Sequence, residues 1–198
     1  MDIDENLSWK THINKIQVKV ASVVGILSKI RYKISTKAAL LIYDALINSH
    51  LQYCNIAWAS TYKSSLHKLY TLQKRTLKIC LKLPLKHSSQ SIFSLSGRQT
   101  IYNINVLQQA TFVYKSLNKM LPIPYHSFFK TINDVHEHDT RSKLNIHSIS
   151  VRTNVRKFSI KIRGQKIWNS IPNNIRCASS EYTLKKSQNI YLKFFNRV

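Results

Sequence analysis

Five residues between positions 134 and 139 have side chains that can bind a metal ion: Asp134, His136, Glu137, His138 and Asp139. Histidine and carboxylate ligands together hold zinc or non-haem metals, but such sites usually draw their ligands from rigid elements several turns apart. These five residues lie in one short polar stretch beside Arg141 and Lys143. We therefore expect an exposed polar segment here, with no metal site and no cofactor.

The residue patterns of known catalytic sites are missing. Two-metal phosphoryl transfer needs carboxylates clustered around ions about 4 Å apart, yet the sequence has no Asp-Asp pair and Asp44 stands alone in an apolar segment. Neither a Gly-rich phosphate loop nor a G-x-S-x-G elbow occurs. The cysteines Cys54, Cys80 and Cys177 are odd in number and far apart, which is typical of small buried thiols in a reducing compartment. We expect no catalysis by this chain alone.

Positive charge is the strongest signal in the sequence. The 198 residues include 31 Lys and Arg against 8 Asp and Glu, a formal net charge of +23. Between Asp44 and Asp134 no acidic residue occurs, although Lys and Arg recur throughout. So large a field of one sign opposes compaction unless a polyanion neutralises it. Nucleic acid, RNA or DNA, is therefore the expected partner.

One group of cations falls in a helix predicted from about Ser64 to Leu83, ended by Pro84. Its members are Lys68, Arg75, Lys78 and Lys82, which share one helix face, with Lys74 beside it. No carboxylate lies four residues away from any of them, whereas a solvated helix face normally mixes Glu with Lys. We expect these residues to contact phosphates.

A second group of cations lies near residue 160. Here Phe158, Ile160 and Ile162 alternate with polar and basic residues, which predicts a short strand with one apolar and one basic face. The basic candidates are Lys157, Lys161, Arg163 and, just beyond Gly164, Lys166.

The expected fold class is mainly α, because three Gly and four Pro are few for this length and apolar residues recur at helical spacing. The clearest stripe comprises Trp9, Ile13, Ile16, Val20, Val23, Leu27 and Ile30, on a helix that we expect Ser8 to cap. Further helices are expected from Ser35 or Thr36 toward Ser49, from Thr100 to the prolines at 122 and 124, around Trp168, and from Glu181 to about Phe195.

These elements divide the chain into four expected parts. Residues 1–7 precede the first helix, 8–120 form a helical bundle, 121–150 form a Pro-containing polar linker, and 151–198 form a small basic subdomain with a short strand or hairpin and helices. The longest apolar run, Ala38–Tyr43, is far shorter than the ~20 residues that span a bilayer. The acidic start, with Asp2, Asp4 and Glu5, differs from targeting peptides. We expect no membrane partner and a cytoplasmic or nuclear location.

Five segments of the sequence resemble, in order, the region after the catalytic palm in reverse transcriptases of jockey-type non-LTR retrotransposons. They are Ile3-Asp4-Glu5-Asn6-Leu7-Ser8-Trp9-Lys10-x-His12-Ile13, Leu46-Ile47-x-Ser49-His50-Leu51-x-Tyr53-Cys54-x-Ile56-Ala57-Trp58, Leu72-Gln73-Lys74-Arg75-x-Leu77-Lys78-Ile79, His136-x-His138-x-Thr140-Arg141-Ser142-Lys143 and Lys157-Phe158-Ser159-Ile160-x-x-x-Gly164-x-Lys166-Ile167-Trp168-Asn169-Ser170-Ile171-Pro172. The resemblance covers nearly the whole chain.

The resemblance implies the thumb and beyond of an RNA-directed DNA polymerase, a helical bundle that lies along the template-primer duplex. Residues 1–7 then correspond to the connection from palm to thumb. The family's catalytic motif, Tyr or Phe followed by Ala-Asp-Asp, lies upstream of this region and is absent here. The implied function is nonspecific binding of template and primer, without catalysis.

Two alternatives remain open at this point. The stripe from Trp9 to Ile30 could dock on a reverse-transcriptase palm domain, which makes the chain a structural module with incidental charge. The chain could also be a non-functional remnant of a mobile element.

Overall fold

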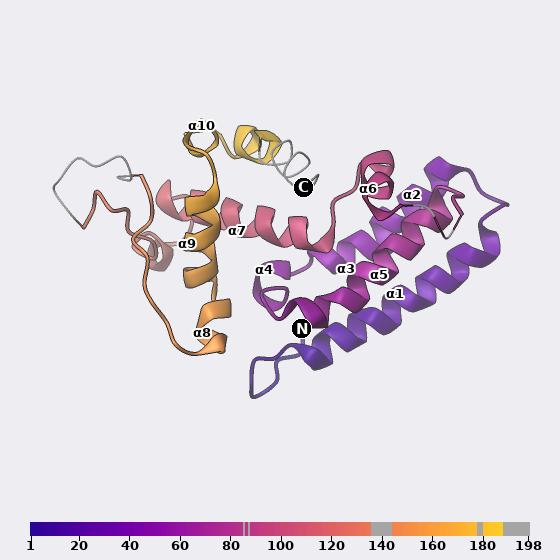
Figure 1. The fold of residues 1–198 in the computed structure, drawn as a ribbon, viewed down its shortest axis with the longest axis horizontal. Helices are drawn as coiled ribbons and strands as arrows, with labels where there is room; N and C mark the ends of the chain where they lie inside the picture. Colours follow the sequence, from indigo (N-terminus) through magenta and orange to yellow (C-terminus); the bar gives the residue numbers. More distant parts are fainter. Residues whose placement is uncertain (85, 87, 136–143, 178–179, 188–198) are drawn as a thin grey trace. The chain divides into compact units, whose positions relative to one another are not determined.

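The computed structural model is mainly helical, as the sequence predicts, and has no strand among its described residues (Figure 1). It describes residues 1–84, 86, 88–135, 144–177 and 180–187. The elements in order are α1 (Lys10–Ile30), α2 (Thr36–Tyr43), the π-helix η1 (Asp44–Asn48), α3 (Ser49–Gln52), α4 (Asn55–Trp58), α5 (Lys63–Cys80), α6 (Ser89–Ser96), α7 (Ile101–Leu117), the 3₁₀ turn η2 (Ile123–Tyr125), α8 (Asn154–Phe158), α9 (Ile160–Ser170) and α10 (Asn173–Arg176). Residues 181–187 are also helical.

The chain forms two compact units, residues 1–104 and 105–198. This division lies inside α7, whereas the sequence placed the end of the bundle at residue 120. Helix α7 contributes buried residues to both units: Ile101 and Ile104 belong to the core of unit 1, and Ala110 and Val113 to the core of unit 2.

Unit 1 is a bundle in which α1 packs along α5 and α2 packs against α5. The predicted apolar stripe faces this core: Ile13, Val20 and Leu27 are buried. Helix α1 starts at Lys10 and its N-cap position is Trp9, so the predicted Ser8 cap is wrong by one residue, although the Ser8 hydroxyl accepts the N–H of Lys10 at 3.5 Å. The carboxylate of Asp4 accepts the backbone N–H groups of Ser8 and Trp9, at 3.0 and 2.9 Å. A carboxylate is favourable there, since it satisfies amides that the first turn leaves free.

The second predicted helix is confirmed and has an internal π-helical turn. The helix begins at Thr36, within the expected start at Ser35 or Thr36, and the hydroxyl of Ser35 caps it by accepting the N–H of Ala38 at 3.2 Å. The backbone then continues through η1 into α3 without leaving helical geometry. Tyr43 and Ile47 on this segment are fully buried.

Unit 2 is built around Trp168, Phe129 and Ile146, together with the second half of α7. The predicted linker over residues 121–150 is therefore wrong where the structure describes it, because Phe129 and Ile146 are core residues. An antiparallel bridge joins Thr131 to Ile146. Residues 188–195 of the predicted last helix lie outside the described part.

The predicted strand around residues 158–162 is also wrong. These residues span the end of α8 and the start of α9, separated by Ser159 in extended conformation. In α9 the buried residues Ile162, Gln165 and Trp168 recur every three positions, which places them on one helix side against the core. The alternation over five residues was too short to outweigh this longer helical pattern.

Candidate nucleic-acid interface

Helix α5 buries one side and exposes the other. Its buried residues include Leu66, Leu69, Leu77 and Cys80, which fix the orientation of the helix against the core. The opposite side carries the cations Lys63, Lys68, Lys74, Arg75 and Lys78, here called the α5 basic surface. Lys63, Lys68 and Arg75 are exposed, whereas Lys74 and Lys78 are half-buried. Four of these five residues were candidates from the sequence, and Lys63 adds a fifth.

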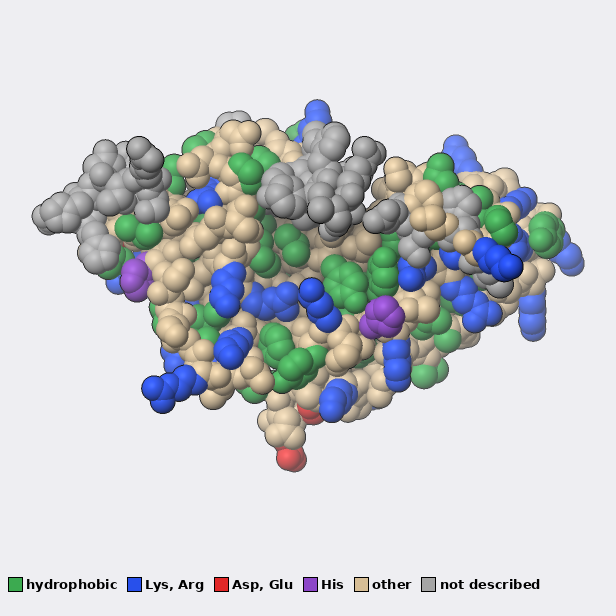
Figure 2. Space-filling view, in the orientation of Figure 1, with side chains coloured by type: hydrophobic (Ala, Val, Ile, Leu, Met, Phe, Trp, Pro, Cys, Tyr) green, Lys and Arg blue, Asp and Glu red, His purple; other side chains and the backbone are tan. Residues whose placement is uncertain are grey.

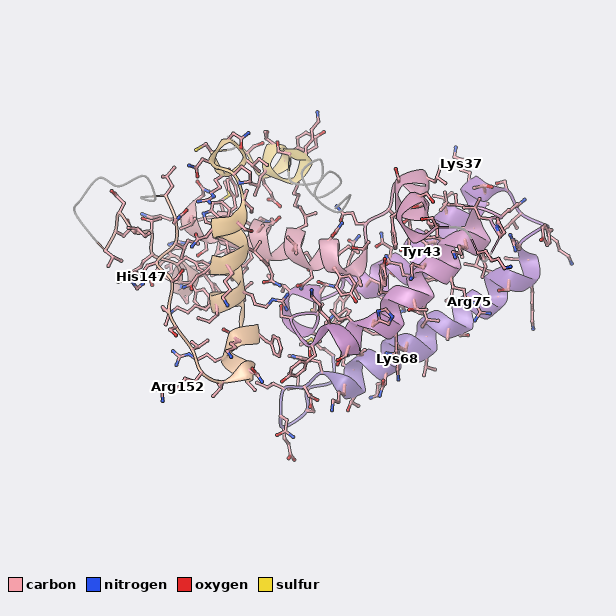
Figure 3. All side chains as sticks on the ribbon, in the orientation of Figure 1. Lys37, Tyr43, Lys68, Arg75, His147 and Arg152 are labelled. Carbon is pink, nitrogen blue, oxygen red and sulfur yellow. The ribbon has the colours of Figure 1, made fainter. Side chains whose placement is uncertain are left out.

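The α5 basic surface has no acidic neighbour on its own helix, because α5 contains no Asp or Glu. Elsewhere in unit 1, Asp2 lies within ion-pair distance of Lys15 and His12, and Asp44 pairs with Arg98. Figure 3 shows Lys68 and Arg75 on α5, and their separation of seven residues corresponds to about two helical turns. In Figure 2 Lys and Arg side chains lie over α5 and also across the rest of the visible face, while few acidic side chains are visible.

Lys82 lies beyond the end of α5, which corrects the predicted helix end near Leu83. The helix ends at Cys80, and Lys82 adopts the left-handed conformation with φ of 58°. The N–H of Leu83 bonds to the carbonyl of Lys78 at 2.9 Å, and the N–H of Lys82 bonds to that of Ile79 at 3.1 Å. This pair of bonds is a Schellman motif. Lys82 is exposed but does not continue the row of cations on the helix.

The four candidates of unit 2 do not all share one face. Lys157 lies in the last turn of α8, and Lys161, Arg163 and Lys166 lie on α9. A strand would have placed Lys161 and Arg163 on the same side, whereas a helix turns about 200° between residues two apart. The ammonium of Lys161 lies over the ring of Phe128, 5.2 Å from its centroid. The single basic strand face expected from the sequence is therefore absent.

Arg163 differs from the other candidates because it is half-buried. Burial lowers the pKa of its guanidinium, since removing water disfavours the charged form. No hydrogen bond or ion pair links this guanidinium to another residue of the described ranges. Lys157 and Lys166 are exposed and remain available to solvent.

No metal site is found among the described residues. Asp134 accepts hydrogen bonds from the N–H and the hydroxyl of Thr131, at 2.8 and 2.7 Å, and these bonds lower the pKa of its carboxyl. His136, Glu137, His138 and Asp139 lie outside the described residues.

Sequence reasoning missed two features that depend on tertiary contacts. Gln73 is fully buried, and its amide nitrogen donates to the Tyr43 hydroxyl and the Gln99 carbonyl, both at 2.8 Å. Its amide oxygen accepts the N–H of Ile101 at 3.0 Å, so Gln73 has a structural role although it lies on the same helix as the α5 basic surface.

The second feature is a groove of about 930 Å³ beside α1, lined by residues that include His12, Lys19 and Tyr53. Residues 1–2, 11–19 and 49–53 line this groove, so it forms only when these separate segments pack together.

Across the described residues, no helix has the length and apolar character needed to cross a membrane. Comparisons with known protein families, with curated proteins and with solved structures find no match to this chain.

Proposed function

We propose that this chain binds RNA or DNA without sequence preference, through phosphate contacts made by the α5 basic surface. The observation that carries the proposal is a long helix whose exposed side bears five cations and whose sequence has no carboxylate. Like charges stacked along a helix reduce its stability in the free protein. Binding to phosphates would relieve that repulsion. It would also release the counterions condensed on the nucleic acid, which favours binding.

The resemblance to the post-palm region of non-LTR reverse transcriptases supports a specific role for this binding. A helical unit with a basic side agrees with a thumb that holds template and primer while an upstream palm performs synthesis. The residues in hand offer no Asp-Asp motif, so the proposed role excludes catalysis by this chain alone. Lys157, Lys161, Arg163 and Lys166 are secondary candidates, because they do not form one surface.

Docking of the Trp9–Ile30 stripe on a palm domain has less support. Ile13, Val20 and Leu27 are already buried in unit 1, each about 1% exposed. A side chain that is enclosed by its own core has no surface left for another domain.

The salt dependence of affinity tests the proposal. Binding of the full chain to a fluorescein-labelled duplex would be measured by anisotropy between about 50 and 200 mM NaCl. We expect the logarithm of the association constant to fall linearly with the logarithm of salt, with a slope of about −0.9 for each phosphate contacted. A slope near zero would refute phosphate binding.

Two matched variants locate the surface. Changing Lys68, Lys74, Arg75 and Lys78 together to Gln should flatten the slope by about 0.9 for each lost contact. The control changes the exposed residues Lys10, Lys19, Lys29 and Lys33 to Gln, which removes the same charge from α1 and the turn after it. An equal loss of slope in both variants would mean that charge acts diffusely and that α5 is not the site.

A further inference from the structure

Three aromatic rings meet beside the α5 basic surface. Tyr70 of α5 lies parallel to Phe93 of α6, with 5.8 Å between ring centroids and 9° between planes. Tyr102 of α7 approaches Tyr70 at 5.3 Å and 49°. All three side chains pack against the core of unit 1 and remain half-buried. We call Tyr70, Phe93 and Tyr102 the Tyr70 cluster.

The Tyr70 cluster is a weakly hydrated aromatic surface. Burial raises the pKa of both Tyr70 and Tyr102, because the phenolate loses more hydration than the phenol. A tyrosine with its ordinary pKa of about 10 is already neutral at physiological pH, and burial moves both groups further from ionisation. Parallel rings with centroids 5.8 Å apart are offset, so Phe93 covers only part of a face of Tyr70.

A cation of the α5 basic surface touches this cluster. The Lys74 ammonium lies 4.6 Å from the centroid of the Tyr70 ring, one helical turn along α5. His67 lies about one turn before Tyr70 on the same helix, and the centroids of the two rings are 6.2 Å apart.

We propose that an unpaired base of single-stranded nucleic acid stacks on the Tyr70 cluster while the adjoining phosphate binds Lys74. This inference rests on the proposed function and adds a second kind of contact to it. Every base has a π-face, so stacking on aromatic side chains tolerates any sequence. The lysine ammonium sits on a flexible stem and holds the ring only weakly, so a phosphate can draw it aside and open the ring to a base.

Two oligonucleotides of equal charge test the stacking. One is a single strand of about 12 thymidines, and the other has the same backbone with abasic sites at every position. The wild-type chain should bind the base-bearing strand more tightly, and Tyr70→Leu should reduce that preference about tenfold, the loss expected for one stacked base. Tyr70→Phe keeps the ring and should keep the preference, which separates loss of stacking from loss of folding.

Tyr53→Leu is the matched control, because Tyr53 is 64% exposed and lines the groove beside α1 rather than the α5 surface. It should leave the preference unchanged. Equal affinity of the wild type for both strands, or a preference that survives Tyr70→Leu, would overturn the inference while leaving the salt slope intact. Absence of salt-dependent binding to either strand would instead overturn the proposed function.

Discussion

Asn169 acts toward Ile146 as a neighbouring β-strand would. Its amide oxygen accepts the N–H of Ile146 and its amide nitrogen donates to the carbonyl of Ile146, both at 2.9 Å. On the other side, the N–H of Ile132 bonds to the carbonyl of Asn145, and the N–H of His147 bonds to the carbonyl of Lys130. One amide side chain of α9 thus completes the pairing of a single extended residue in the core of unit 2.

Loss of this amide should destabilise unit 2. Asn169→Leu leaves the N–H and C=O of Ile146 without partners in a partly buried setting, and we expect a cost of about 2–4 kcal/mol in the free energy of unfolding. Urea denaturation followed by circular dichroism measures it. Ser170→Ala, at an exposed neighbouring position, should change stability by about 0.5 kcal/mol or less. Equal effects of the two changes would contradict the role of Asn169.

Two glycines should respond oppositely to alanine. A Cβ at Gly164 would lie 2.9 Å from Cγ2 of Val113 and 3.2 Å from Cζ of Phe129, so Gly164→Ala should cost about 1–3 kcal/mol through overpacking. Gly25 on α1 has nothing within 4 Å of that position. Gly25→Ala should therefore stabilise the chain by about 0.5–1 kcal/mol, since Ala favours helix. Thermal or urea unfolding of both variants checks the opposite signs.

The left-handed conformation of Lys82 gives another pair of opposite effects. Lys82→Gly removes the penalty that a side chain incurs there and should raise the free energy of unfolding by up to about 1 kcal/mol. Lys68 lies inside α5, so Lys68→Gly should lower the free energy of unfolding by about 1 kcal/mol. Both changes remove one positive charge, so their difference isolates the backbone effect. A destabilising Lys82→Gly would contradict the Schellman end of α5.

Arg163 should separate stability from binding. Arg163→Met removes a half-buried charge that lacks a described partner, so we expect the free energy of unfolding to stay the same or to rise. The affinity for nucleic acid should fall, because the variant lacks a guanidinium that would contact a phosphate. Lys166→Met, at an exposed position of the same helix, should leave stability within about 0.5 kcal/mol. Urea denaturation and the anisotropy assay measure the two quantities. A marked loss of stability in Arg163→Met would mean that the guanidinium has a structural partner.

The three thiols should react at different rates. The expectation of buried thiols is wrong for Cys54 and Cys177, which are exposed. Cys80 is buried, and its burial raises the thiol pKa to about 11. At pH 8 iodoacetamide should alkylate Cys54 and Cys177 quickly and Cys80 only as the chain unfolds, which mass spectrometry resolves. Because the folded pKa exceeds the unfolded value, the stability from the protonated thiol is complete below about pH 9 and is lost as pH rises toward 11. Cys80→Ala should lack this contribution, and fast alkylation of Cys80 would contradict its burial.

The sequence predicted the long helices well because their apolar pattern is long enough to be unambiguous. The stripe containing Ile13, Val20 and Leu27 repeats over more than three heptads, and the core of unit 1 uses it as expected. The pattern from Phe158 to Ile162 covers only five residues and fits a strand. The burial of Gln165 and Trp168, at positions three and six after Ile162, fits a helix instead, and the structure has a helix here. A buried polar residue such as Gln165 breaks the apolar pattern that would have revealed it.

The candidate site was predictable only where it lies on one helix. Lys68, Lys74, Arg75 and Lys78 follow from helical spacing, and the structure places them on the side of α5 away from the core. The meeting of Tyr70 with Phe93 and Tyr102 depends on how α6 and α7 pack on α5, and no local spacing encodes it. The same holds for Gln73, whose partners Tyr43, Gln99 and Ile101 are between 26 and 30 residues away.

Helix α7 has a practical consequence for anyone who wishes to express either half of this chain. A stop codon after Ile104 would leave Ile101 and Ile104 on a single turn, which only packing in the core of unit 1 would hold, since so short a helix is not stable by itself in water. Ending at Leu117 instead would keep the helix but leave Ala110, Val113 and Tyr114 without the residues that bury them. Each truncated product therefore loses part of what makes its own core fold.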